Sequence, residues 1–181
     1  MLQKFSLKNG VQVATYQLPS LKSIHLRISV KGGSLVEDKK HNGVAHFMEH
    51  MLVQGIPSYP NVEEFSHFIE GIAGSYGAYT KSLAVSFYLT VPAPYLEEVV
   101  KITGETFFEP LFVEAALEKE RRAVLEEIHQ RMDSHWYKIG DFFIKSLLRS
   151  KHPLTYDGGG KIESVMALTR QDLMEYWKEY F

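Results

Sequence analysis

The chain has 181 residues, of which 45% are hydrophobic and 23% are charged, so it is long enough to form one well-packed globular domain. Its net charge of -2 provides no strong field for binding nucleic acid or an anionic membrane, and no run of about 18 apolar residues predicts a membrane span. Because the chain has no cysteine, disulfides and thiolate ligands are excluded, and any metal site has to use His, Asp or Glu.

The first half of the chain predicts antiparallel strands. It begins without the apolar core of a signal peptide, which favours a cytoplasmic location. Two alternating, β-rich stretches at 3–7 and 11–17 flank Asn9-Gly10, a dipeptide that predicts a hairpin turn. The same alternation, typical of half-buried strands, recurs at 23–30, 74–80 and 84–91.

The stretch from Asn42 to Val53 is apolar except for Asn42 itself, His46, Glu49 and His50. We expect a helix here, with Asn42 as its N-cap. Four residues advance a helix by about 400°, so His46 and His50 lie roughly 40° apart on successive turns, and Glu49 lies roughly 60° to the other side of His46. The three polar groups therefore form one patch on a helix that is otherwise apolar all round and should be buried.

Burying a carboxylate beside two imidazoles costs free energy unless all three are satisfied. A divalent metal would do this, with the two imidazoles as ligands and Glu49 left to act on a bound water. The simpler alternative is that His46 and His50 are core histidines with ordinary hydrogen-bond partners. The His-x-x-Glu-His spacing and its apolar setting favour the metal site.

A second informative helix is predicted over about 113–131. If Val124 marks the centre of its apolar face, Glu120 and Glu127 fall roughly 40° and 60° from that centre, on the core side. Two inward acids need a partner. From this helix alone, they could equally lie at the boundary with extended side chains or pair with Arg121.

Further helices are predicted over 61–73, 95–108, 134–148 and from 169 to the end of the chain. In the helix over 134–148 we expect the core residues to be Trp136, Phe143, Ile144, Leu147 and Leu148. The fold class that follows is α+β, with an antiparallel sheet of about five strands and helices packed on one of its faces.

His46-Phe47-Met48-Glu49-His50 is the inverted zinc-protease signature, and the surrounding sequence resembles the pitrilysin family, which includes insulin-degrading enzyme and mitochondrial processing peptidase. The likeness extends from Gly33-Ser34 through Glu37 and Gly43 to the signature. It continues over essentially the whole chain, in the segments 11–30, 61–80, 109–112, 120–128 and 152–154.

The resemblance implies a zinc metalloendopeptidase with one Zn²⁺ per chain. It places a third zinc ligand at Glu127, 77 positions after His50, and at Glu120 an acid that orients a ligand histidine. Glu49 would be the general base. The strand at Tyr76, Gly77, Ala78 and Tyr79 would pair with an extended peptide substrate through backbone hydrogen bonds.

The chain departs from the family pattern in two ways. Relatives often carry Asn-Ala-x-Thr on the substrate strand, whereas this chain has Gly77-Ala78-Tyr79-Thr80, which puts the contact at position 77 in doubt. Family enzymes also pair this domain with a second, similar one, fused, as a separate subunit or as a second copy. We therefore expect 1–181 to be a single N-terminal zinc-peptidase domain that lacks its last strand and needs a partner.

Two other functions compete with a peptidase. The chain could be a zinc-binding, non-catalytic subunit or half-enzyme that is active or stable only with a partner domain. It could also be a simple metal-dependent binding module, but such a module has no reason to place Glu49 beside the metal.

Overall fold

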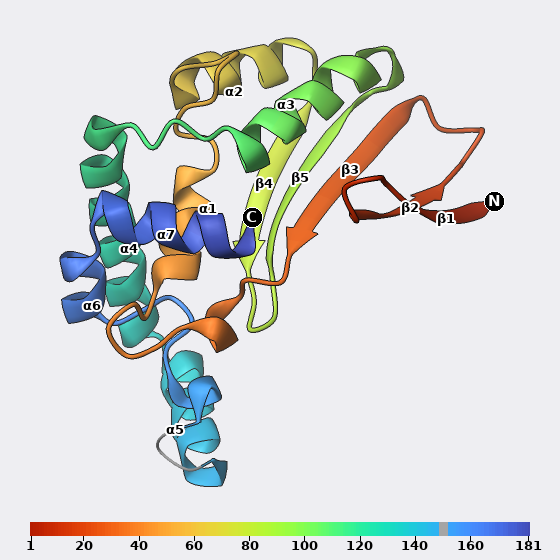
Figure 1. Ribbon diagram of the computed structural model, residues 1–181. Coiled ribbons are helices and arrows are strands. Elements are labelled where there is room, and N and C mark those ends of the chain that lie inside the picture. Colours follow the sequence, from red (N-terminus) through yellow and green to blue (C-terminus); the bar gives the residue numbers. More distant parts are fainter. Residues whose placement is uncertain (149–151) are drawn as a thin grey trace.

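The computed structural model describes residues 1–148 and 152–181, which contain five strands and seven α-helices (Figure 1). The strands are β1 (Leu2–Ser6), β2 (Gln12–Tyr16), β3 (Ser23–Val30), β4 (Ser75–Thr80) and β5 (Val85–Pro92). The helices are α1 (Val44–Met51), α2 (Val62–Gly71), α3 (Leu96–Phe108), α4 (Glu114–Asp133), α5 (His135–Leu147), α6 (Ile162–Ala167) and α7 (Arg170–Tyr180). The α+β class is confirmed.

Three strands form the sheet that supports the helices, in the order β3-β5-β4, with both pairs antiparallel. The central strand β5 buries its apolar side chains, which are Val85, Phe87, Leu89 and Val91. Because side chains alternate along a strand, these four residues share one face. Helices α1 and α3 pack against that face of the sheet, and the opposite face carries mostly polar and tyrosine side chains.

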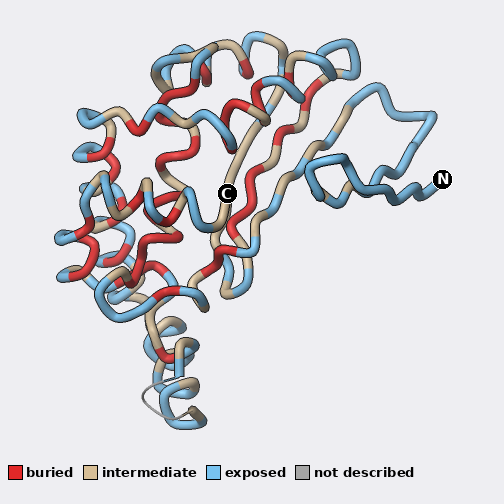
Figure 2. The backbone as a smooth tube through the Cα atoms, viewed as in Figure 1, coloured by how far each residue is buried: buried red, intermediate tan, exposed pale blue. Residues whose placement is uncertain are grey.

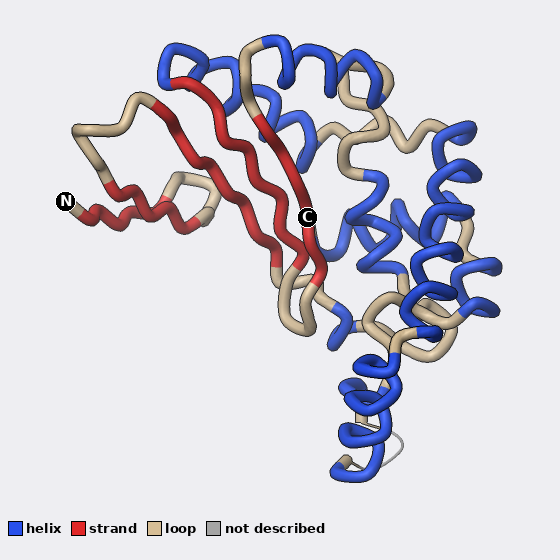
Figure 3. Tube along the Cα trace, turned by 180° about the vertical axis from the view of Figure 1, so that it is seen from behind, coloured by secondary structure: helices blue, strands red, loops and turns tan. Residues whose placement is uncertain are grey.

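The other two strands form a separate hairpin, in which β1 pairs only with β2. Seen from behind, β3, β5 and β4 run side by side, while the hairpin lies apart from them (Figure 3). The sequence predicted one sheet of about five strands, and the structure divides the five between two sheets. Alternation shows that a strand has two faces, but it does not show which edge the strand pairs with.

The core is centred on α1, which contacts α4, α7, β4 and β5. Five of its eight residues are buried, namely Val44, Ala45, Phe47, Met48 and Met51. Figure 2 shows the buried segments concentrated around this helix and along β5. None of the helices in the described parts of the chain combines the length and the apolar character that crossing a bilayer requires.

Helix α5 does not pack as the sequence predicted. Trp136 is 84% exposed, Phe142 74% and Leu147 64%, and Phe143 is exposed as well. The helix extends away from the body of the domain (Figures 1 and 2). Ile144 and Leu148 are only half-buried and do not belong to the core cluster, so the prediction that Trp136, Phe143, Ile144, Leu147 and Leu148 are core residues is wrong. Periodic apolar residues identify the apolar face of a helix, but they do not show that another element covers that face.

Candidate metal centre

Helix α1 begins with an unusual cap. Its N-cap is Gly43, whose φ of 97° lies in the left-handed region that favours glycine. The buried carboxylate of Glu37 accepts hydrogen bonds from the backbone N–H groups of Gly43 and Ala45, both at 2.9 Å. The carboxyl oxygens at this end of the helix satisfy N–H groups that have no partner within the helix. The prediction that Asn42 caps α1 is wrong.

Asn42 instead links the start of α1 to a distant loop. Its side-chain N–H group donates to Glu37 at 2.9 Å and to the backbone carbonyl of Asp157 at 2.8 Å. Asp157 also contacts Arg131 of α4, with Nη1 and Oδ1 3.5 Å apart, and accepts a hydrogen bond from the Tyr137 hydroxyl. This network connects the N-terminus of α1 with the end of α4 and the start of α5.

The two histidines of α1 lie side by side on its surface, as their spacing predicted. The ring centroids of His46 and His50 are 4.9 Å apart and the rings are nearly perpendicular. Both side chains are largely enclosed, with exposed fractions of 11% and 15%.

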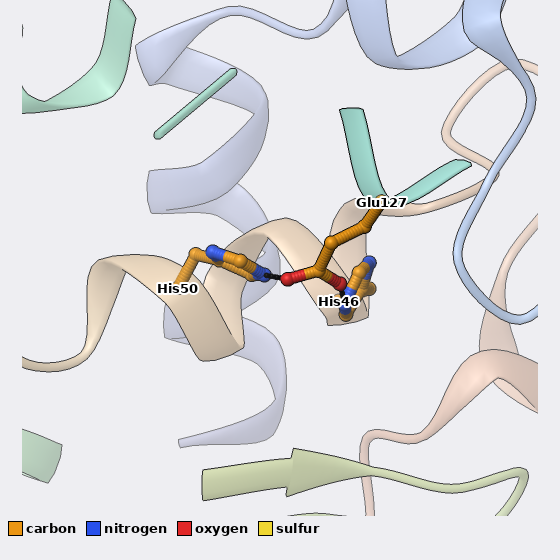
Figure 4. A group of neighbouring side chains, drawn as sticks. All are labelled: His46, His50 and Glu127. Atoms are coloured by element: carbon orange, nitrogen blue, oxygen red, sulfur yellow. Dashed lines mark ion pairs between the residues drawn. The ribbon is translucent and has the colours of Figure 1, made fainter. Parts of the chain in front are cut away.

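Helix α4 packs against α1 and brings two acids to these imidazoles. Glu127 reaches between the two rings, with its carboxylate oxygens 3.3 Å from His46 Nε2 and 3.5 Å from His50 Nε2 (Figure 4). Glu120, two turns earlier on α4, lies 3.0 Å from His50 Nδ1. Both acids face the histidines, and pairing with Arg121 is excluded because Arg121 pairs with Glu118. Glu120 is buried, whereas Glu127, with 49% of its side chain exposed, lies at the boundary.

The donor set fits a tetrahedral zinc ion. His46, His50 and Glu127 each offer one ligand atom, and these atoms all lie within 4.8 Å of one another. Ligands about 2.1 Å from zinc in a tetrahedral arrangement are roughly 3.4 Å apart, close to the two distances from Glu127. Two imidazoles and a carboxylate leave a fourth position for water, as catalytic zinc sites do.

Glu120 can fix which nitrogen of His50 is available. If His50 Nδ1–H donates to the Glu120 carboxylate, the lone pair of Nε2 faces Glu127 and the space between the ligands. A carboxylate behind a ligand histidine sets its tautomer and orientation in this way and makes it a better donor to the metal.

The pKa values of the two imidazoles are shifted in opposite directions. Burial lowers the pKa of His46 to about 4, helped by the neighbouring charges of His50 and Arg131. Burial also acts to lower the pKa of His50, but the carboxylates of Glu120 and Glu127 outweigh it and raise that pKa. The neutral form of His46, which is the form that binds metal, is therefore favoured at neutral pH.

Glu49 is not one of the three grouped ligands. Burial raises the pKa of its carboxyl group, against the opposing effects of hydrogen bonding from Thr80 and the charge of His50. Thr80 also donates to the backbone carbonyl of Ala45 at 3.3 Å, which ties the end of β4 to α1. A carboxyl group with a raised pKa beside a metal centre is suited to accept and release a proton.

The four residues predicted on the substrate strand lie on β4, an edge strand of its sheet. The Tyr76 ring faces the core, where it packs against Phe65 and Phe87. Ala78 also packs against the core. Gly77 and Tyr79 fall on the opposite face, because side chains alternate along a strand.

The sequence missed the supporting residues of this centre, which are Glu37, Thr80, Arg131 and Asp157. Glu37 is present in the stretch that carries the family resemblance, but no pattern within the sequence assigns it as a cap. Arg131 and Asp157 become neighbours only through the fold, since 26 positions and the whole of α5 separate them.

Comparisons with known proteins identify the family of this chain. Residues 12–154 match the model of the insulinase family, peptidase family M16. The chain is 26% identical over its full length to the uncharacterized zinc protease YmxG of Bacillus subtilis, of which it spans 44%. Among solved structures, pitrilysin aligns with a TM-score of 0.87 at 25% identity, over 99% of this chain and 20% of that one.

A peptidase M16 inactive domain from Pseudomonas fluorescens aligns with a TM-score of 0.88 at 20% identity, over 98% of this chain and 43% of that one. The fold therefore occurs in a domain named as inactive, so the fold alone does not determine activity. The family match covers most of the chain, and the inverted His-x-x-Glu-His signature lies within the matched residues. This chain belongs to the insulinase family, peptidase family M16.

Proposed function

We propose that this chain is the zinc-binding domain of a metalloendopeptidase that hydrolyses peptides or unstructured polypeptides. The observation that carries the proposal is the meeting of His46, His50 and Glu127 in one group, with Glu49 on the same helix as the histidines and outside the ligand set. Family membership supports zinc as the metal, because relatives are named zinc proteases.

In the proposed reaction His46, His50 and Glu127 hold one zinc ion. Zinc, when bound, supplies a Lewis acid that acidifies a water molecule and polarises the scissile carbonyl. Glu49 accepts the proton of the attacking water and passes it to the leaving amine. Glu120 holds His50 in the orientation that directs Nε2 to the metal.

The substrate is proposed to add to the free edge of β4. An extended peptide paired there gains backbone hydrogen bonds that do not depend strongly on its sequence. The position is suitable because Thr80, the last residue of β4, is close enough to Glu49 to hydrogen-bond with it and donates to Ala45 of α1. A peptide alongside β4 therefore runs toward the general base.

We further propose that residues 1–181 act together with a second, similar domain, either fused, as a separate subunit or as a second copy. The chain spans less than half of the length of the curated relative YmxG. Sizing the zinc-loaded chain at several concentrations, together with a peptidase assay, tests this proposal. A strict monomer that cleaves peptides efficiently would contradict it.

The decisive experiment compares zinc-loaded wild type with Glu49→Gln on an unstructured peptide, with metal content measured in the same samples. We expect Glu49→Gln to keep its zinc and to lose about 10²–10⁴-fold in turnover, because it removes only proton transfer. Glu126→Gln is the matched control, since it is the same change at an exposed position of α4. Normal cleavage by Glu49→Gln would refute the assignment.

The second candidate function is a zinc-binding half-enzyme that is inactive by itself. It is favoured by the span of the chain and by the similarity in fold to a domain named as inactive. It predicts stoichiometric zinc in the wild type without cleavage, and cleavage that appears only when a second domain is supplied. The third ligand is tested separately, since full zinc occupancy in Glu127→Ala would exclude Glu127 from the metal site.

A further inference from the structure

The face of the three-stranded sheet that α1 and α3 leave open carries a basic hollow beside β4. Its volume is about 420 Å³, and its lining includes Arg27 of β3, Tyr79 of β4 and Lys81 in the β4–β5 turn. The register places Ser29 opposite Ser86 and Ser86 opposite Tyr79, so one cross-strand row runs through the hollow to the free edge of β4.

Two cations in this hollow converge on one phenol. Arg27 Nη1 donates to the Tyr79 hydroxyl at 3.3 Å, and Lys81 Nζ lies 5.3 Å from the centre of the Tyr79 ring. A hydrogen bond with Ser86 and the charges of Arg27 and Lys81 lower the pKa of Tyr79. Within the described parts of the chain, neither Arg27 nor Lys81 has a carboxylate at ion-pair distance, and no acid lines the hollow.

Next to the hollow, the Tyr88 side chain covers β4 at Gly77. A Cβ atom at Gly77 would lie 2.4 Å from the Tyr88 hydroxyl, so the Tyr88 ring occupies the space above this residue. The rings of Tyr79 and Tyr88 are 6.4 Å apart. The open face of the sheet therefore carries two phenols, Tyr79 on β4 and Tyr88 on β5, and two cations without an acidic partner among the described residues, which lie around the Tyr79 side chain.

A peptide that pairs with β4 has to direct alternate side chains to this face. Its residue opposite Tyr79 lies beside the Tyr79 side chain, around which the two cations are arranged. Thr80, the next residue of β4, hydrogen-bonds with Glu49, so the paired residue falls within roughly two positions of the bond that Glu49 attacks. A carboxylate at that position meets Arg27 and Lys81, whereas a cation meets like charge.

We propose that Arg27 and Lys81, arranged around Tyr79, form a subsite that selects substrate peptides with an acidic side chain on the open face of β4. The inference rests on the proposed function, because it requires a peptide paired with β4. It adds a specificity determinant to backbone pairing, which by itself discriminates little between sequences.

The test uses zinc-loaded Glu49→Gln protein and an unstructured peptide blocked at both ends, so that every carboxylate belongs to a side chain. One position at a time is made Glu, Gln or Lys across the segment around the cleavage site, and binding is followed by fluorescence anisotropy. We expect one position where Glu binds roughly two- to fivefold more tightly than Gln, and Lys more weakly still. The preference should weaken with added salt and be absent at the two adjacent positions.

Charge variants connect the preference to the two cations. Arg27→Gln and Lys81→Gln should each reduce the discrimination between Glu and Lys peptides, and Arg27→Glu should reverse it. Lys22→Gln is the matched control, because it removes an exposed lysine just before β3, at the opposite end of the sheet. Since all three side chains are exposed, these changes should leave the melting temperature nearly unchanged.

Equal binding of the Glu, Gln and Lys peptides would overturn the inference, as would a discrimination that Lys22→Gln reduces as much as Arg27→Gln does. Absence of binding by every peptide would also overturn it. Failure of the proposed function gives a different result. The wild type would then cleave no peptide in the presence of zinc, although the binding preference for acidic peptides would still be observed. Cleavage without charge preference would keep the function and remove the subsite.

Discussion

Two regions of the domain depart from the usual pattern of apolar side chains inside and polar side chains outside. The junction of α1 with α4 buries polar side chains, and α5 exposes apolar ones. At the junction, His46, His50 and Glu120 are largely enclosed among apolar neighbours. On α5, Trp136 and Phe142 face solvent. Each reversal costs free energy in the isolated domain, since polar groups lose hydration in one place and apolar surface stays hydrated in the other.

The two regions differ in whether neighbouring groups offset this free-energy cost. The polar groups of the junction contact one another, and their geometry fits a metal ion. Helix α5 lies against the end of α4 and the 3₁₀ turn at Pro153–Thr155, and most of its large apolar side chains are exposed. The junction therefore brings its buried polar groups together in a geometry that fits a metal ion, whereas α5 leaves its apolar side chains exposed to solvent.

The largest effect that would sharpen this comparison is expected for Phe47→Ala. Phe47 stands between His46 and His50 in the sequence of α1 and is fully buried. The centre of its ring lies 5.3 Å from the guanidinium carbon of Arg121. Removing it should lower the free energy of unfolding by about 3–5 kcal/mol. Urea denaturation of the metal-free protein measures this, and a loss below about 1 kcal/mol would mean that α1 is not the centre of the core.

A smaller effect is expected at Glu37, the residue that caps α1. The free energy of unfolding should depend on pH because of its carboxyl group. Burial raises the pKa of Glu37 from 4.5 to about 7, although hydrogen bonds from Gly43, Ala45 and Asn42 act in the opposite direction. Between these values the folded chain binds more protons than the unfolded chain. The stability that Glu37 contributes is thus fully present below about pH 4.5 and is lost as the pH rises through about 7.

Glu37→Gln keeps a side-chain oxygen that can accept hydrogen bonds from the N–H groups, but the amide does not gain or lose a proton in this pH range. With a chelator present, wild type should lose up to about 3 kcal/mol relative to Glu37→Gln between pH 4.5 and 7.5. Parallel denaturation curves of the two proteins at each pH provide the measurement. A constant difference across that range would show that the carboxyl group does not titrate there.

Glu120→Gln should weaken zinc binding with little loss of stability. The amide cannot hold the Nδ1 proton of His50 as a carboxylate does, so zinc affinity should fall about 10–100-fold. Titration against a competing chelator measures this affinity, with Glu126→Gln as the control of equal charge. Unchanged affinity in Glu120→Gln would mean that the 3.0 Å contact with His50 does not influence the metal.

The smallest effect is expected on α5. Phe142→Ala removes the same side chain as Phe47→Ala, but from a position that is 74% exposed, so the free energy of unfolding should change by less than about 0.5 kcal/mol. Thermal melting of the two alanine variants in parallel tests the comparison directly. If Phe142→Ala destabilises the domain as much as Phe47→Ala does, then α5 is packed in solution and the contrast fails.

Residues that act within one element could be predicted from the sequence. The spacing of His46 and His50 placed both rings on one side of α1, and Asn9-Gly10 predicted the first hairpin, because both depend on local geometry alone. That Glu120 and Glu127 lie on the same side of α4 also followed from helical period, although their contact with the histidines needed the packing of α4 on α1.

Residues that act through long-range contacts could not be predicted. Glu37 caps a helix from outside it, and Tyr88 fills the space over Gly77 from the neighbouring strand. The exposure of Trp136 was missed for a related reason, since periodicity contains no information about a covering element. Division of the strands into two sheets likewise depends on edges, which alternation does not identify.

The hydrogen bonds around Asn42 have a consequence for the order in which the domain is made. Asn42 bonds to Asp157, 115 positions later, and the Ser164 hydroxyl donates to the Asn42 carbonyl across 122 positions. During synthesis, the two histidines and Glu127 all emerge before Asp157 and Ser164, the distant partners of Asn42. Such non-local contacts form late, because closing a long loop costs entropy before the contact repays it. The three candidate ligands, His46, His50 and Glu127, are thus all present in the growing chain before these contacts can form, so we expect their final geometry to be reached only in the last stage of folding.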